Sequence, residues 1–119
     1  ISAYAMLDFA CKKFDMQDVI RCSLGLTKAE CRLLNYLLGE PEPLTTAEIA
    51  KNLDIDRTTV QKSIKTLVDK DVVKRLQENL DKGGYIFRYM IHDKEVIRTR
   101  IKRTITAWYE NVMAGLEKW

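Results

Sequence analysis

The sequence predicts a mainly α-helical domain that contains one small β-hairpin, and therefore an α+β fold. Three observations support this class. Apolar residues recur at helical spacing over most of the chain, three helix-start signals follow one another, and a stretch rich in aromatic and β-branched residues follows a glycine turn. A length of 119 residues suits a single domain, so we expect residues 1–119 to form one. Five glycines and two prolines argue against a loop-rich or all-β design.

The first expected element is an N-terminal helical segment over residues 6–24, built as one or two helices. Its apolar residues recur at helical spacing, at Met6, Phe9, Ala10 and Phe14 and then at Val19, Ile20 and Leu24. Gly25 suits the left-handed residue that ends such a helix. The position of Met6 also raises the hypothesis that residues 1–5 are a vector-derived leader.

Three later segments share one kind of helix start, in which a side-chain oxygen accepts a backbone N–H of the first turn. Thr27 with Glu30, and Thr45 with Glu48, have the spacing of a capping box. Asp56 supplies the third N-cap. Gly39 ends the first of these helices. A loop that contains two prolines separates it from the second, and residues 54–56 form the tight turn before the third.

The pattern changes after residue 70. Val72, Val73 and Leu76 indicate a short strand, residues 79–84 contain a glycine turn, and residues 85–91 indicate a returning strand. Asp93 then begins a long helix over residues 93–119. Its apolar residues are spaced three or four apart, at Ile97, Ile101, Ile105, Trp108, Val112, Leu116 and Trp119.

This order of elements is that of a winged helix-turn-helix, which we expect over residues 26–91, with the wing at residues 72–91. The flanking helices over residues 6–24 and 93–119 are expected to serve dimerisation. Isologous dimers are the commonest assembly, and Trp108 is costly to leave in water. The expected interface residues are Ile97, Ile101, Ile105, Trp108, Val112 and Leu116, although part of this stripe could instead pack on the N-terminal helices.

The helix over residues 57–70 is the expected recognition helix for double-stranded DNA. Its N-terminal and outward positions carry side chains that bond base edges or phosphates. The candidate base contacts are Arg57, Thr58, Gln61 and Lys62, and the candidate phosphate contacts are Thr59, Lys65, Lys82 and Arg88. The net charge of the whole chain, +3, is too small to indicate DNA binding. Residues 57–75 carry a net charge of +4, however, whereas residues 1–44 carry −1.

The remaining chemistry indicates neither an enzyme nor a cofactor. One histidine and three cysteines without a C-x-x-C spacing predict no metal site, and no catalytic constellation or nucleotide loop appears. No segment suits a signal peptide or a membrane span, so we expect a cytoplasmic protein with reduced thiols. Redox or metal sensing through Cys11, Cys22 or Cys31 remains an alternative.

Residues 24–32, 47–50 and 60–73 resemble those of archaeal TrmB-like and MarR-like winged-helix transcriptional regulators, over roughly residues 19–91. The resemblance implies a recognition helix that begins at Arg57, a wing on phosphates or in the minor groove, and a homodimer on a pseudo-palindromic operator. Larger TrmB regulators carry a sugar-binding domain after the wing. This sequence has none, so a sugar effector is not expected.

The sequence therefore predicts a homodimeric transcriptional regulator that binds specific double-stranded DNA. A fold does not by itself determine a function, so a second class of function is possible. In that alternative, the chain is a winged-helix protein-interaction module without specific DNA binding. The operator, the regulated genes and the effector leave no signature in the sequence.

Overall fold

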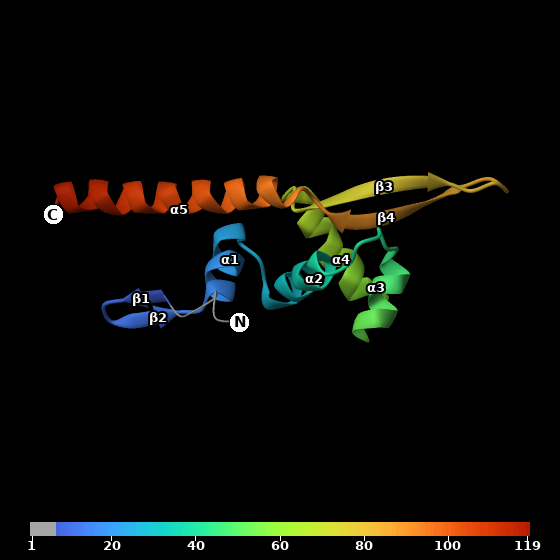
Figure 1. Ribbon diagram of the computed structural model, residues 1–119, viewed down its shortest axis with the longest axis horizontal. Helices are drawn as coiled ribbons and strands as arrows, with labels where there is room; N and C mark the ends of the chain where they lie inside the picture. The colour runs from blue at the N-terminus through green and yellow to red at the C-terminus, as the bar shows by residue number, and fades with distance from the viewer. Residues whose placement is uncertain (1–6) are drawn as a thin grey trace. The chain divides into compact units, whose positions relative to one another are not determined.

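The computed structural model describes residues 7–119 and shows the α+β winged-helix fold that the sequence predicts (Figure 1). The hypothesis about residues 1–5, and the expected helical position of Met6, lie outside these residues. The elements in chain order are β1 (Leu7–Phe9), β2 (Lys12–Phe14), α1 (Met16–Leu24), α2 (Lys28–Leu38), α3 (Thr46–Leu53), α4 (Arg57–Asp69), β3 (Val73–Asn79), β4 (Tyr85–Ile91) and α5 (Lys94–Glu117). Two compact units contain them: Lys28–Ile97, and residues 7–27 with Arg98–Trp119.

The prediction of a helix through residues 7–14 is wrong, because this segment forms the antiparallel hairpin β1–β2. The aromatic residues that suggested a helical face meet across the two strands instead. Phe9 and Phe14 lie edge to face with ring centroids 6.4 Å apart, and Asp8 pairs with Lys13. Asp15 then begins α1, because its side chain accepts the Gln17 N–H at 3.1 Å.

The helix boundaries follow the capping chemistry of the sequence. Gly25 ends α1 with a φ of 66°, a left-handed conformation that glycine adopts without steric cost. The capping box at α3 has both of its bonds: the Glu48 N–H donates to Thr45 Oγ1 at 3.1 Å, and the Thr45 N–H donates to Glu48 Oε1 at 2.9 Å. Asp56 caps α4 by accepting the Thr59 N–H at 2.9 Å.

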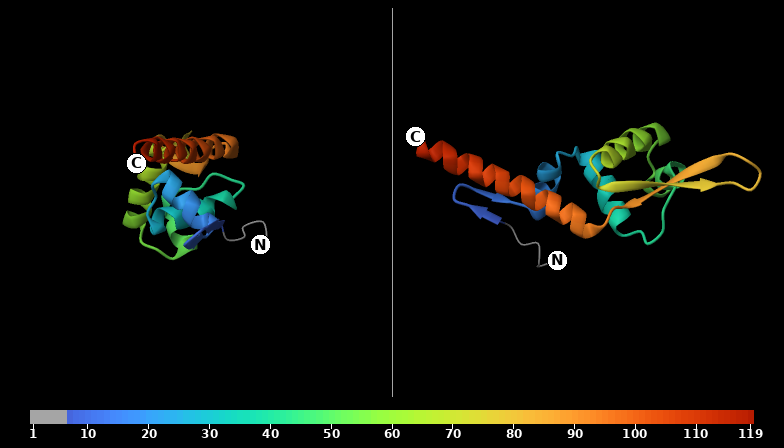
Figure 2. Two further views of the ribbon diagram at one scale, coloured as in Figure 1. Left: turned by 90° about the vertical axis from the view of Figure 1, so that its left-hand side faces the viewer. Right: turned by 90° about the horizontal axis from the view of Figure 1, so that it is seen from above.

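The winged-helix unit, Lys28–Ile97, has its apolar core where α2, α3, α4 and the base of the hairpin β3–β4 meet. Figure 2 shows the three helices gathered at one end of this hairpin. Its fully buried large side chains are Leu33, Leu34 and Leu37 from α2, Ile49 from α3, Val60 and Leu67 from α4, and Val72 and Val73 before and at the start of β3.

The hairpin β3–β4 is the wing. It is joined in register from Val73 opposite Ile91 to Asn79 opposite Tyr85. Its turn contains Gly83 and Gly84 at φ values of 94° and 81°, where a side chain would be strained. Leu44, in the loop before α3, pairs with Tyr89 through two backbone bonds of 2.9 and 2.7 Å. The base of the wing is therefore tied to the entrance of α3.

Helix α5 begins after Asp93, as predicted, with the Glu95 N–H donating to Asp93 Oδ1 at 2.9 Å. Its apolar stripe is not uniform in exposure. Ile97 is buried within the single chain and leaves little surface for a partner, whereas Ile101 is half-buried and the apolar side chains beyond it are exposed. Among residues 7–119, no helix has the length and apolar character needed to cross a bilayer.

The end of α2 offers a matched pair of leucines that tests this core. Leu37 is 1% exposed and Leu38 is 43% exposed. Leu37→Ala should lower the free energy of unfolding by about 2–5 kcal/mol, because it removes buried methyl groups and leaves a cavity. Leu38→Ala should cost less than about 1 kcal/mol. Urea unfolding followed by circular dichroism measures both, and equal losses would contradict the placement of the core.

Candidate nucleic-acid interface

The helix pair α3–α4 is joined by a turn that contains one left-handed residue and is closed by a backbone hydrogen bond. Asp54 has a left-handed conformation with a φ of 54°, and the Ile55 N–H donates to the Ala50 carbonyl at 3.1 Å. Ala50 is only 9% exposed, and its small side chain takes up little room between the two helices. The turn therefore allows α4 to cross α3 directly, as in a helix-turn-helix.

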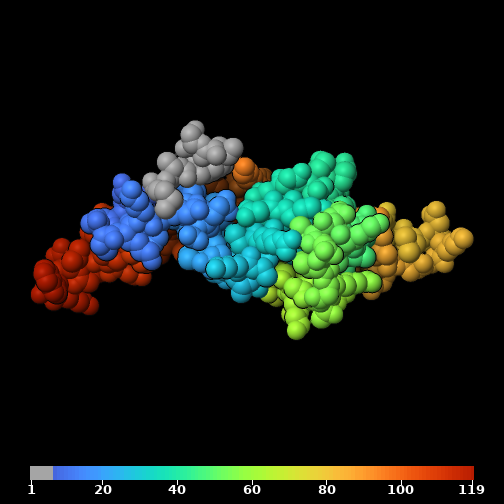
Figure 3. All heavy atoms as spheres, turned by 90° about the horizontal axis from the view of Figure 1, so that it is seen from below, coloured from blue at the N-terminus to red at the C-terminus, as the bar shows by residue number. Residues whose placement is uncertain are grey.

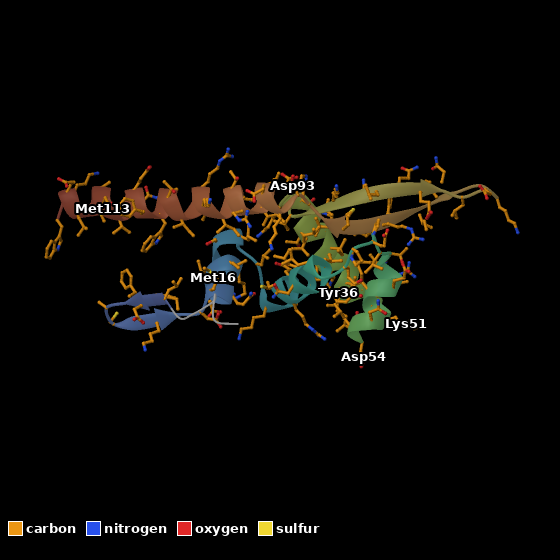
Figure 4. The ribbon with its side chains drawn as sticks, viewed as in Figure 1. Met16, Tyr36, Lys51, Asp54, Asp93 and Met113 are labelled. Carbon is orange, nitrogen blue, oxygen red and sulfur yellow. The ribbon has the colours of Figure 1, made fainter. Side chains whose placement is uncertain are left out.

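Helix α2 holds α3 through two polar contacts. Asn52 donates to the Tyr36 hydroxyl at 2.7 Å, and Figure 4 labels Tyr36 on α2 together with Lys51 and Asp54 near this end of α3. The Arg32 guanidinium donates to the Leu53 carbonyl at 3.1 Å. The second contact satisfies a carbonyl at the C-terminus of α3, where a cation is also favoured by the helix dipole.

Helix α4 has one buried face and one exposed face. Its buried residues recur with the period of a helix and lie on one face: Val60, Ser63, Ile64 and Leu67. The four candidate base contacts, Arg57, Thr58, Gln61 and Lys62, are all exposed. Packing of the buried face therefore brings the predicted base-contacting side chains together on the N-terminal half of one helix.

The N-cap of α4 engages one of the predicted phosphate contacts. The Thr59 hydroxyl donates to Asp56 Oδ1 at 2.6 Å, and the Thr59 N–H donates to Oδ2 of the same carboxylate at 2.9 Å. These two bonds, the side-chain bond first, lower the pKa of Asp56 below its ordinary value of 3.8. Thr59 is half-buried, so its first role in this structure is to stabilise the helix start.

Lys65, another predicted phosphate contact, lies one turn before Asp69 on the exposed face of α4. Their charged atoms are 3.7 Å apart, and both side chains are more than half exposed. An exposed ion pair of this kind contributes little free energy. Lys65 can therefore exchange Asp69 for a phosphate at small cost.

An open groove of about 450 Å³ lies between the N-terminal half of α4 and strand β4 of the wing. Arg57 and Gln61 line it on the α4 side. The wing contributes Tyr85, Ile86, Phe87 and Tyr89, and the start of α3 contributes Thr45, Thr46 and Ala47. Figure 3 shows the wing projecting from the packed helices of this unit. Recognition helix and wing thus share one polar and aromatic surface.

Sequence reasoning missed the aromatic part of this surface. Tyr85 and Phe87 lie on one face of β4 with ring centroids 5.2 Å apart, and the Arg75 guanidinium lies 4.2 Å from the centre of the Phe87 ring. Aromatic residues alternate at positions 85, 87 and 89, and this pattern could have predicted that one face of the strand is aromatic. Which residues lie next to this aromatic face depends on how the wing packs, and the sequence pattern does not predict that packing.

Arg88, the predicted phosphate contact on β4, is held by two carboxylates. Its Nε donates to Glu78 Oε1 at 2.9 Å across the hairpin, and its Nη1 donates to Glu48 Oε1 on α3 at 3.1 Å. The bond to Glu78 is the main cause that raises the pKa of Arg88, and the Glu48 carboxylate adds to it. The bonds of Glu48 to Thr45 and to Arg88 lower the pKa of Glu48. Arg88 therefore ties the wing to the first turn of α3, while Lys82 lies exposed in the wing turn.

The sulfur and imidazole groups do not gather into one site. Cys11 and Cys22 are exposed and Cys31 is buried. The His92 ring accepts the Asp93 N–H at 2.8 Å through Nδ1, which is a local contact before α5. Within residues 7–119, no group of three or more histidine, cysteine and acidic side chains is arranged to hold a metal ion.

With this geometry described, comparison with known proteins decides the family. The family model described as "Sugar-specific transcriptional regulator TrmB" matches residues 20–95, which span the helix-turn-helix and the wing. The chain belongs to the TrmB family of transcriptional regulators. A relative from Methanocaldococcus jannaschii, the uncharacterized protein MJ1082, is 36% identical over 108 residues, which cover 91% of this chain and 85% of the relative.

Solved structures show the same fold. A possible transcriptional regulator from Methanosarcina mazei Go1 is 41% identical, with a TM-score of 0.89 and 98% of each chain covered. A mutant of MepR from S. aureus bound to an oligodeoxyribonucleotide has a TM-score of 0.56 at 17% identity, over 87% of this chain and 73% of MepR. At 17% identity, the similarity to MepR shows only that the chain shares the fold of the MarR-like winged helices. This TrmB-family chain is thus a transcription regulator with a MarR-like winged helix.

Removal of the Arg88 guanidinium should loosen the wing without unfolding the helices. Arg88→Gln removes both ion pairs, so we expect faster hydrogen exchange of amides near the wing turn, while the amides of α2 keep their protection. Lys82→Gln is the matched control, because it removes a wing charge that lies in the turn. Equal exchange rates in wild-type protein and Arg88→Gln would show that the ion pairs do not hold the wing.

The cap of α4 should make stability depend on acid. Because the folded pKa of Asp56 is lowered, its contribution is complete above the ordinary value of 3.8 and is lost as the pH falls through the lower folded value. Asp56→Asn keeps an oxygen that accepts from Thr59 but does not titrate. Any stability advantage of the wild type over this variant in urea unfolding should therefore shrink below about pH 4. An advantage that grows on acidification would contradict the assignment.

Proposed function

We propose that this TrmB-family regulator binds specific sequences of double-stranded DNA as a homodimer. The recognition helix α4 enters the major groove, and the wing lies on the adjacent backbone or in the minor groove. The observation that carries the proposal is the exposed N-terminal half of α4, where Arg57, Thr58, Gln61 and Lys62 lie together on a helix whose opposite face is buried. The N-terminal end of a recognition helix is the part that contacts base edges.

The four side chains have complementary bonding capacities for base recognition. Arg57 can donate two parallel bonds to O6 and N7 of guanine, and Gln61 can bond N6 and N7 of adenine. Thr58 can contact a thymine methyl group or a phosphate, and Lys62 offers a mobile positive charge. Because α4 holds these residues on a fixed scaffold, the order of the bases they contact is set by the helix geometry.

The backbone contacts come from Lys65 on α4 and from the wing. Lys82 lies exposed in the wing turn, outside the two paired strands. Arg88, in contrast, would have to share its guanidinium between Glu48, Glu78 and a phosphate. We therefore expect Lys82 to contribute directly and Arg88 mainly through the position of the wing. Thr59 can donate its O–H to a phosphate only after the bond from that hydroxyl to Asp56 Oδ1 breaks.

The homodimer is supported by the exposed apolar side chains of α5. Trp108 and Leu116 are 58% and 55% exposed in the single chain, and the other members of the predicted stripe beyond Ile101 are exposed as well. Large apolar and aromatic side chains of this kind mark interfaces rather than solvated helix faces. A dimer would present two copies of α4 to two half-sites of a pseudo-palindromic operator.

Two substitutions on α4 should separate base recognition from phosphate binding. With a site obtained by selection from random duplexes, Arg57→Ala should weaken specific binding by about 1–3 kcal/mol and change random-duplex binding much less. Lys65→Ala should weaken both alike and reduce the slope of log K against log salt by about one unit. Fluorescence anisotropy at several salt concentrations measures the affinities of the wild type and of both variants for each duplex.

The outcomes of this titration are distinct. Equal loss on specific and random DNA for Arg57→Ala would contradict the base contact. No binding of any duplex by the wild-type protein at low salt would contradict the proposed function and favour a protein-interaction module. Light scattering on the same samples reports the dimer, and a monomeric mass at micromolar protein would contradict that part of the proposal.

A further inference from the structure

The hairpin β1–β2 has one apolar face and one charged face. Directly opposed residues of an antiparallel pair point to the same side, so Leu7 with Phe14, and Phe9 with Lys12, share one face. Asp8 and Lys13 share the other. The Lys12 ammonium lies 5.4 Å from the centre of the Phe14 ring, on the apolar face. Such a two-sided pattern is typical of a hairpin that is covered on one side.

In the single chain this apolar face is uncovered. All six strand residues are exposed, and the side chain of Phe9 is 58% exposed. The extensive contacts of β1 and β2 are with each other. A two-stranded hairpin is marginally stable by itself in water and needs a surface to pack against. An additional surface must therefore bury Leu7, Phe9 and Phe14 if the hairpin is to persist.

The same chain carries an apolar surface of the matching kind on the C-terminal half of α5. Tyr109 and Met113 lie beside the predicted stripe and widen it to a band, which consists of Ile105, Trp108, Tyr109, Val112, Met113 and Leu116. Every member of this α5 band is at least 37% exposed in the single chain. The hairpin face and the band therefore both leave a large part of their apolar surface in solvent in the single chain.

The charges around the two surfaces are also complementary. Residues 7–14 carry a net charge of +1, and residues 105–119 carry −1. Glu110 and Glu117 lie three residues before and four residues after Met113, so they flank that edge of the α5 band. Lys12, on the apolar face of the hairpin, is in position to meet these carboxylates when the two surfaces pack together.

We propose that the hairpin β1–β2 is a dimerisation arm, whose Leu7, Phe9 and Phe14 face packs on the α5 band of a second copy of this chain. Each chain carries both the hairpin face and the α5 band, so a twofold dimer can form this contact twice and leave neither surface unused. We therefore infer that a second copy of the chain covers the hairpin. The inference rests on the homodimer of the proposed function and names the surfaces that form it.

The two faces of the hairpin give a matched test by dimer dissociation. Phe9→Ala with Phe14→Ala removes apolar side chains from the covered face, so the dimer dissociation constant should rise about tenfold or more. Asp8→Ala with Lys13→Ala changes the opposite face and should leave the constant within about twofold. Sedimentation equilibrium measures the constants, and circular dichroism confirms that the winged helix stays folded.

A crosslink identifies the surface that the arm contacts. One chain keeps Cys11 in the exposed hairpin turn with Cys22→Ser, and a second chain carries Cys11→Ser, Cys22→Ser and Met113→Cys. After subunit exchange, a short bis-maleimide should join the two chains, as shown by mass spectrometry of the linked peptides. Ala114→Cys, on the side of α5 away from the band, replaces Met113→Cys in the control and should give much less product.

The results separate this inference from the proposed function. A wild-type dimer whose constant is unchanged by the Phe9 and Phe14 substitutions would overturn the arm while leaving the homodimer in place. Equal crosslinking through Met113→Cys and Ala114→Cys would do the same, and a monomeric wild type would overturn both. Weaker dimerisation of the Phe9 and Phe14 variant, together with crosslinking of Cys11 to Met113→Cys but not to Ala114→Cys, supports the arm whether or not the protein binds DNA.

Discussion

The burial of one face of α4 is the constraint on which the winged helix depends. Val60 and Leu67 are completely buried and Ile64 nearly so, in the core that α2 and α3 complete. At about 25 cal/mol for each Å² of apolar surface removed from water, these side chains give α4 one preferred rotation about its axis. That rotation places Arg57 and Gln61 outward. The outward position of the predicted base contacts is therefore a consequence of core packing.

The wing depends on the same helix pair through a different kind of contact. Backbone bonds between Leu44 and Tyr89 join β4 to the entrance of α3, and Arg88 links Glu78 on β3 to Glu48 on α3. Glu48 thus has two tasks, because its carboxylate also completes the capping box of α3. A change at one side chain of the first turn of α3 would reach both the helix start and the wing. This shared carboxylate joins the start of α3 to the wing.

The two compact units divide the tasks of the molecule. Lys28–Ile97 contains the helix-turn-helix and the wing, and every predicted DNA contact lies within it. Residues 7–27 and Arg98–Trp119 contain exposed apolar side chains on both β1–β2 and α5. The first unit has a buried core of its own, whereas many large apolar side chains of the second are exposed in the single chain.

The sequence by itself determined the features that depend on neighbours along the chain. The caps at Thr45 and Asp56, the left-handed Gly25, the wing turn and the fold class all follow from local hydrogen bonding and backbone sterics. The N-terminal hairpin was missed because Phe9 and Phe14 also fit a helical spacing, and short segments leave that choice to cross-strand pairing. Only the tertiary structure decided that Ile97 is buried, that Arg88 is held by two carboxylates, and that Phe87 and Tyr85 face the groove beside Arg57. These outcomes depend on contacts between residues distant in sequence, whose packing geometry no local pattern specifies.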